Sequence, residues 1–98
     1  MLVHSVFFWL KPELSADQKA QFRKGLESLR GIESVVHLYV GTPSKTDRPV
    51  IDRSYSFALT VIFKDMAGHD VYQEHRLHTA FLEQFKTSWQ KVLIYDAE

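Results

Sequence analysis

The pattern of hydrophobic residues from position 2 to position 10 predicts a β-strand with two apolar faces. Successive residues of a strand point to opposite faces. One face carries Leu2, His4, Val6, Phe8 and Leu10, and the other carries Val3, Ser5, Phe7 and Trp9. A strand with one face in water would alternate apolar with polar residues. We therefore expect the second face to be covered as well, by helices, by another subunit or by a ligand.

A capping signal predicts that a helix follows this strand. Ser15 is followed three residues later by Gln18. At the start of a helix, residues with this spacing form a capping box, in which the side chain of each accepts a hydrogen bond from the backbone N–H of the other. The apolar residues that come next recur at helical spacing and are Phe22, Leu26 and Leu29. Gly31 is placed to end the helix in a left-handed conformation.

Two further strands are predicted in the middle of the chain. Residues 35–40 have strand composition and end at Gly41. Residues 42–54 then carry two prolines and five charged side chains, which indicates a loop. Residues 55–63 alternate between large and small side chains, with Phe57 on the large face, and form the clearest strand of the sequence.

The last third of the chain predicts a broken helical region and a final strand. Asp65 can cap a helix that runs through Tyr72, and a second helical segment is expected at about residues 78–89. Its apolar side chains at helical spacings are Phe81, Leu82, Phe85 and Trp89. Residues 92–95 close the chain as a short strand. The order β-α-β-β-α-β predicts an α+β fold of the ferredoxin-like, split βαβ type, with a four-stranded antiparallel sheet and helices on one face.

Composition indicates one domain, residues 1–98, and excludes several classes of binding partner. The chain has 12 basic and 12 acidic residues and no polybasic run, so we expect neither nucleic acid nor a membrane as a partner. Cysteine is absent, which excludes thiolate nucleophiles and thiolate metal sites and is compatible with the cytoplasm, where we place the protein. No phosphate-binding loop, nucleophile elbow or nucleotide fingerprint occurs.

The segment YQEHRLH, residues 72–78, carries the candidate chemistry. His78, as a neutral imidazole, could remove an acidic proton beside a carbonyl, and the hydroxyl of Tyr72 could donate to the oxygen where negative charge develops. The other interpretation is structural, with His75 and His78 capping two helical pieces and Tyr72 anchoring a helix to the sheet. His4, on an apolar strand face, is either a hydrogen-bonded core residue or a pocket residue.

A metal site built on His75 and His78 would need a third ligand, for which Glu74 and His4 are the candidates, and a spacing of three residues is less diagnostic than the four-residue spacing of zinc-binding helices. We therefore expect no metal and no cofactor. His37 and His69 are interpreted as exposed residues of a strand and a helix.

The chain resembles the stress-responsive A/B barrel domains, a family of dimeric α/β barrels. The resemblance spans nearly the whole chain, and its most specific part is the tyrosine-x-x-histidine-x-x-histidine element formed by Tyr72, His75 and His78. Shorter matches are VHSV at residues 3–6, VIF at 61–63 and IYD at 94–96. The resemblance implies a homodimer in which two sheets face each other with the helices outside.

The same resemblance suggests an activity, because the family contains a cofactor-free plant polyketide cyclase, olivetolic acid cyclase. Its pocket tyrosine, its basic histidine and its first-strand histidine match Tyr72, His78 and His4. This chain differs from the family pattern at Arg76, where proline is usual, and from the cyclase at Phe57, where the cyclase has a pocket histidine. We expect a more apolar pocket, walled by Phe22, Leu26 and Phe57 and also lined by His4 and His75.

Two functions are compatible with these residues. In the first, the protein is a cofactor-independent cyclase, lyase or isomerase that acts on a small, polyketide-like keto compound, with His78 as base and Tyr72 as donor. In the second, the same residues orient a small apolar ligand in a binding or stress-response protein, and no bond changes. The sequence leaves open whether the protein is an enzyme.

Overall fold

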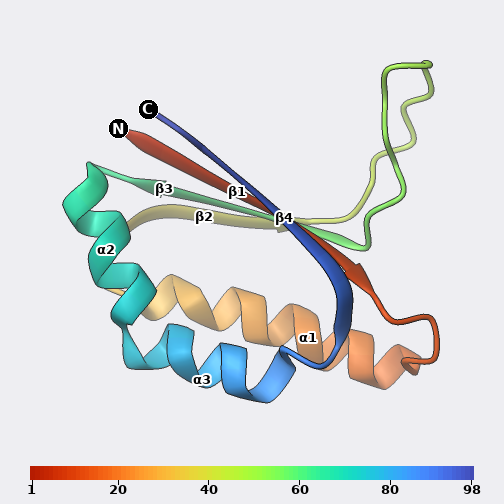
Figure 1. Cartoon of the computed structure of the whole chain (residues 1–98), viewed down its shortest axis with the longest axis horizontal. Helices are drawn as coiled ribbons and strands as arrows, with labels where there is room; N and C mark the ends of the chain where they lie inside the picture. The colour runs from red at the N-terminus through yellow and green to blue at the C-terminus, as the bar shows by residue number, and fades with distance from the viewer.

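A twisted antiparallel sheet carries three helices on one of its faces in the computed structural model, which describes residues 1–98 (Figure 1). The elements are β1 (Leu2–Leu10), α1 (Ala16–Ser28), a 3₁₀ turn (Leu29–Gly31), β2 (Val35–Gly41), β3 (Phe57–Phe63), α2 (Met66–Glu74), α3 (Arg76–Phe85) and β4 (Trp89–Ala97). The strand order is β2-β3-β1-β4, and every neighbouring pair is antiparallel. The predicted α+β ferredoxin-like architecture is confirmed.

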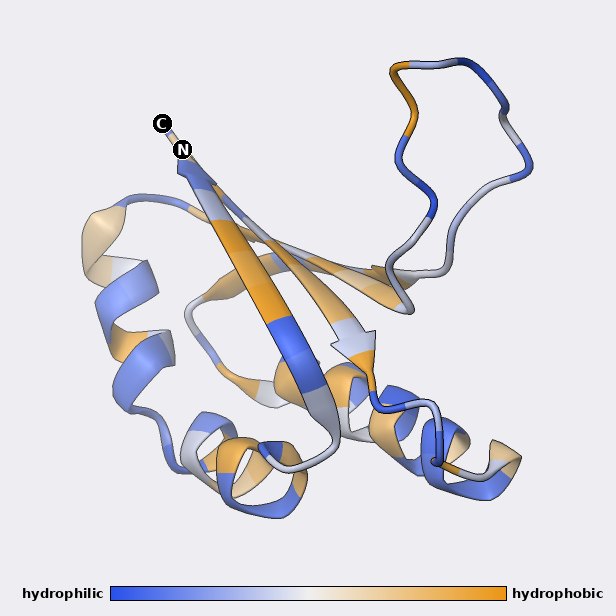
Figure 2. Cartoon of the chain, turned by 45° about the vertical axis from the view of Figure 1, so that its right-hand side comes forward, coloured by the Kyte–Doolittle hydropathy of each residue, from blue (hydrophilic) through white to orange (hydrophobic).

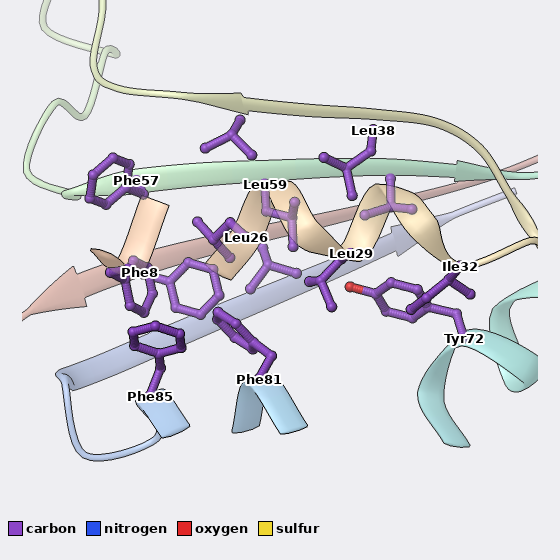
Figure 3. Close-up of a cluster of buried hydrophobic side chains, with 14 of the residues drawn as sticks. Phe8, Leu26, Leu29, Ile32, Leu38, Phe57, Leu59, Tyr72, Phe81 and Phe85 are labelled. Atoms are coloured by element: carbon purple, nitrogen blue, oxygen red, sulfur yellow. The ribbon is translucent and has the colours of Figure 1, made fainter. Parts of the chain in front are cut away.

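The core lies between the sheet and the helices. Every second residue of β1 is buried, and in β3 the same alternation buries Phe57, Leu59, Val61 and Phe63. Aromatic side chains fill one end of this layer, where Phe81 lies close to both Phe8 and Phe85, whereas Tyr72 lies beside Leu29 and Ile32 at the other end (Figure 3). Figure 2 shows the strands as largely hydrophobic and the helices as hydrophobic only in part.

Helix α1 starts as the sequence predicts but ends differently. The Oγ of Ser15 accepts a hydrogen bond from the backbone N–H of Gln18 at 3.1 Å, and the Gln18 side chain accepts one from the N–H of Ser15 at 2.8 Å. The predicted left-handed end at Gly31 is wrong, because no glycine has a positive φ. The chain instead tightens into the 3₁₀ turn, which buries Leu29.

The predicted second helical segment is wrong at both of its ends, because α3 begins earlier, at Arg76, and stops at Phe85. Trp89, predicted as part of this helix, is instead the first residue of β4, where it pairs with Leu10 across the sheet. Its indole still packs in the core, with its ring centroid 5.2 Å from that of Phe8. The final strand is correspondingly longer than the predicted residues 92–95.

Residues 42–56 form the long connection between β2 and β3, and they project from the sheet (Figure 2). Strand β3 begins at Phe57, two residues later than predicted, and Tyr55 lies in the connection with its ring centroid 5.2 Å from that of Phe7. No helix is long and apolar enough to span a membrane.

Candidate functional site

A largely apolar cavity of about 240 Å³ lies between the inner face of the sheet and helices α2 and α3. Most of the residues that line it are hydrophobic. The polar exceptions are His4 from β1, Tyr72 and Gln73 from α2, and His78 from α3. An apolar cavity with a few convergent polar groups is the usual form of a small-molecule site.

Tyr72 and His78 meet at this cavity although they belong to different helices. Tyr72 is 1% exposed and its hydroxyl points toward Leu29 (Figure 3). The ring centroids of Tyr72 and His78 are 4.8 Å apart. Nδ1 of His78 is buried and makes no hydrogen bond. The base and the donor predicted from the sequence are therefore neighbours in space.

Burial shifts the pKa values of both side chains in the directions that their proposed roles need. The pKa of Tyr72 is raised by desolvation, so the hydroxyl keeps its proton and remains a donor. The pKa of His78 is lowered from its ordinary value of 6.5, first by desolvation, while the nearby backbone of Gln73 opposes this shift and the positive charge that His4 can carry adds to it. The His78 imidazole is thus neutral near pH 7 and can accept a proton.

His75 has a structural position at the break between α2 and α3. Its Nδ1 accepts a hydrogen bond from the N–H of Leu77 at 3.1 Å and caps α3, while its Nε2 lies 3.3 Å from Glu33. The helix breaks at His75, which is extended with ψ of 143°, and Arg76 takes the first position of α3. Proline, which the resemblance led us to expect at this position, is not needed for the break. His75 is not among the residues that line the cavity.

The other predicted site residues divide between cavity and core. His4 lines the cavity, is 3% exposed, and its Nδ1 pairs with Oδ1 of Asp96 at 2.5 Å. Phe22, Leu26 and Phe57 are buried in the core and do not line the cavity. The apolar wall is formed instead by side chains such as Phe81 and Trp89.

Three polar residues at or beside the cavity were not predicted from the sequence. His69 was expected to be exposed, but its side chain is only 16% exposed, and its ring lies 5.3 Å from that of His4. Its position three residues before Tyr72 on a helix places both on one face and could have indicated this. Gln73 and Asp96 were also missed. His37 is exposed, as predicted.

Comparisons with solved structures show the fold in several bacterial and plant proteins. A Dabb family protein with a ferredoxin-like fold from Mesorhizobium loti is 26% identical, with a TM-score of 0.81, and the match covers 99% of this chain and 94% of that one. A dimeric ferredoxin-like protein from Thermobifida fusca is 21% identical, with a TM-score of 0.80 over 98% of this chain and 88% of that one. The hydroxynitrile lyase of Passiflora edulis is 21% identical, with a TM-score of 0.81 over 98% and 90% of the two chains.

A search of curated proteins found no match to this chain. The similarity to olivetolic acid cyclase therefore stays a prediction. The model of one family matches residues 2–98, nearly the whole chain. Together with the ferredoxin-like sheet and the Tyr72–His78 element, this match establishes that the chain belongs to the stress responsive A/B barrel domain family, or Dabb.

Proposed function

We propose that the protein is a cofactor-independent lyase, cyclase or isomerase that acts on a small, largely apolar keto compound. The observation that carries this proposal is the meeting of Tyr72 and His78 in an apolar cavity, with ring centroids 4.8 Å apart. His78 is the general base, and Tyr72 is the donor to the carbonyl oxygen.

The reaction begins with a proton transfer. Neutral His78 takes the acidic proton from the carbon next to a carbonyl, and the electron pair of the C–H bond moves onto the carbonyl oxygen. The Tyr72 hydroxyl donates a hydrogen bond to this oxygen, where the enolate charge develops. The imidazolium then returns its proton to a different carbon in an isomerase, or to the oxygen of a second carbonyl that the enolate has attacked in a cyclase. In a lyase the enolate expels a leaving group from the neighbouring carbon, and that group takes the proton.

The fold comparison supports the lyase branch of this proposal. The Passiflora edulis protein, which has the same fold, is a hydroxynitrile lyase by name. At 21% identity it indicates only that this architecture can hold a lyase site, so the substrate of the present protein is not inferred from it.

A non-catalytic function is the second candidate, because the cavity wall is mostly apolar. In this case Tyr72, His78 and His4 orient the polar end of a bound molecule that leaves unchanged. Such a protein would retain a ligand through purification, and His78→Ala would bind that ligand about as well as the wild type.

We also propose that the protein works as a homodimer in the cytoplasm. The sheet face away from the helices carries Phe7, Trp9, Leu93 and Tyr95, and Tyr95 is 62% exposed. A second copy packed on this face would remove these side chains from water. The Thermobifida fusca protein with the same fold is dimeric. Sedimentation at micromolar concentration tests the assembly, and a stable monomer would contradict it.

Deuterium exchange tests the catalytic proposal directly. The wild type is incubated with a panel of β-diketones and polyketide mimics in deuterated buffer, and deuterium uptake at the acidic carbon is followed by NMR. We expect uptake faster than in buffer for at least one compound. Tyr72→Phe should lose about 2 to 4 kcal/mol of oxyanion stabilisation, and His78→Ala should lose about 10²- to 10⁴-fold in rate with the base.

His37→Ala is the matched control, since His37 is exposed on β2, away from the cavity. It should exchange like the wild type. Uptake at the buffer rate for every compound would reject the enzyme. Catalysis that survives both Tyr72→Phe and His78→Ala would reject the assigned residues.

A further inference from the structure

Three side chains from separate elements bring metal-binding atoms together beside the cavity. His4 of β1, His69 of α2 and Asp96 of β4 each offer one such atom, and the three atoms lie within 4.8 Å of one another. Ligands of a tetrahedral zinc ion lie about 3.4 Å apart, because each bond is about 2.0 to 2.2 Å long. Small side-chain rotations would bring the three atoms from their present separations to the separation that zinc needs. We infer that these residues form a binding site for one divalent transition-metal ion of the Zn²⁺ class.

The backbone fixes two of the three ligands before any ion binds. His4 and Asp96 are direct partners in the antiparallel pairing of β1 with β4, so their side chains share one face of the sheet. Nδ1 of His4 and Oδ1 of Asp96 already lie 2.5 Å apart. An ion would enter between them, and the pair would open by a fraction of an ångström.

The third ligand is oriented by its own neighbours. Nδ1 of His69 lies 3.2 Å from Oδ1 of Asp70, the carboxylate–histidine contact that commonly fixes a metal-binding imidazole. The other nitrogen, Nε2, lies 3.3 Å from the side-chain amide of Gln73, a contact that an ion would replace. His69 and Tyr72 stand three residues apart on α2, so the helix presents His69 on the side that packs against the sheet.

The chemistry of the ligands selects the kind of ion. Two imidazole nitrogens and one carboxylate oxygen suit Zn²⁺, Co²⁺ or Ni²⁺, whereas Mg²⁺ and Ca²⁺ prefer sets made of oxygen. Three protein ligands leave at least one position for water or another small molecule. The site does not include Tyr72 or His78, but it borders their cavity, because His4 lines the cavity and its ring centroid lies 5.8 Å from that of Tyr72. A bound ion would link β1, β4 and α2.

Calorimetric titration tests the site in the full chain without an added histidine tag, after dialysis against a chelator. Zinc chloride should bind at one ion per chain and raise the midpoint of thermal unfolding, and magnesium chloride should do neither. His69→Ala should weaken zinc binding at least tenfold, as should Asp96→Asn. Asp70→Asn should weaken it about 10- to 100-fold by releasing the His69 ring.

The matched control is His37→Ala, which removes an exposed histidine and should bind zinc like the wild type. Circular dichroism should show that all the variants remain folded. Visible absorption of bound Co²⁺ gives a second readout, because a low-coordinate nitrogen and oxygen site absorbs more strongly than hydrated cobalt. Equal zinc affinity in the wild type and His69→Ala would overturn the inference, as would an equal loss in His37→Ala.

Discussion

The two faces of the sheet are both apolar in sequence, but they differ in what covers them. On the inner face, Leu2, Val6 and Phe8 of β1 are at most 5% exposed beneath the helices. On the outer face, Phe7 and Trp9 are only partly buried, and together with neighbouring side chains they border a hollow of about 220 Å³.

The inner face therefore serves folding and chemistry and the outer face serves association, a difference that the hydrophobic pattern of the sequence does not show. The inner face makes the fold and holds the polar groups that can do chemistry, because burial there shifts their pKa values. The outer face is apolar around Phe7, Trp9 and Leu93, with Tyr95 and Lys91 beside them, and it suits association with a similar surface. Substitutions on the inner face should therefore lower the stability of the fold, whereas substitutions on the outer face should weaken association.

The largest effect on stability is expected from truncation on the inner side. Leu26 is fully buried, and Leu26→Ala should lower the free energy of unfolding by about 2 to 5 kcal/mol. The matched variant is Leu93→Ala on the outer face, where the side chain is 37% exposed. In dilute, monomeric protein it should change stability by about 0.5 kcal/mol or less. Urea denaturation measures both, and equal losses would erase the distinction between the faces.

The next largest effect is expected from a charge on the outer face. Leu93→Asp would place a carboxylate in the proposed dimer contact of both subunits, which should weaken association at least a hundredfold, or about 3 kcal/mol. Val71→Asp on α2, where the side chain is 46% exposed, should leave association unchanged. Sedimentation equilibrium provides the measurement. A dimer that tolerates Leu93→Asp would have to use another surface.

Two helical glycines test how tightly the inner layer is filled. A Cβ at Gly25 would lie 2.4 Å from Cε2 of Phe85, so Gly25→Ala should cost about 1 to 3 kcal/mol of overpacking, more than its gain in helix propensity. A Cβ at Gly68 would meet Phe63 at an ordinary 3.5 Å, so Gly68→Ala should stabilise α2 by up to about 1 kcal/mol. Thermal unfolding should show opposite signs, and stabilisation by both would contradict this packing.

A smaller effect is expected at the break between α2 and α3. His75→Ala removes the cap of α3 and should lower stability by about 1 kcal/mol, as Ser15→Ala should at the start of α1. Neither variant should lose deuterium exchange to the extent that His78→Ala does. If His75→Ala abolishes exchange and leaves stability unchanged, His75 contacts the substrate rather than the backbone.

The smallest effect is a dependence of stability on pH. Because burial lowers the pKa of His78 in the folded protein, the unfolded chain takes up its proton first as the pH falls below about 6.5. The stability associated with neutral His78 is therefore full above pH 6.5 and declines as the pH falls toward the lower folded-state pKa. His78→Gln should flatten this part of the urea-derived profile, and His37→Gln should not. The same slope in both variants would assign the effect to other groups.

Local signals in the sequence predicted the fold well because they act over a few residues. The Ser15–Gln18 capping pair and the Asp65 cap mark helix starts, and both make the expected hydrogen bonds. Trp89 was misplaced because a four-residue spacing after Phe85 fits a helix equally well. Its place in β4 depends on pairing with Leu10, at the other end of the chain.

The site was less predictable, because it depends on which strands become neighbours. Tyr72 and His78 could be found from one short motif. Asp96 becomes a partner of His4 only through the register of β1 with β4, and no local pattern encodes that register. His69 looked like an ordinary helical surface residue, and only the packing of α2 on the sheet buries it beside His4.

The central position of β1 also determines when the protein can fold. Its two neighbours, β3 and β4, are distant in the chain, and His4 and Asp96 are 92 positions apart. Pairings of such long range slow folding, since the entropy of closing large loops is lost before the contacts form. During synthesis β1 therefore lacks one of its two partner strands until residues 89–97 have left the ribosome. Nascent chains of this protein are expected to depend on chaperones until then.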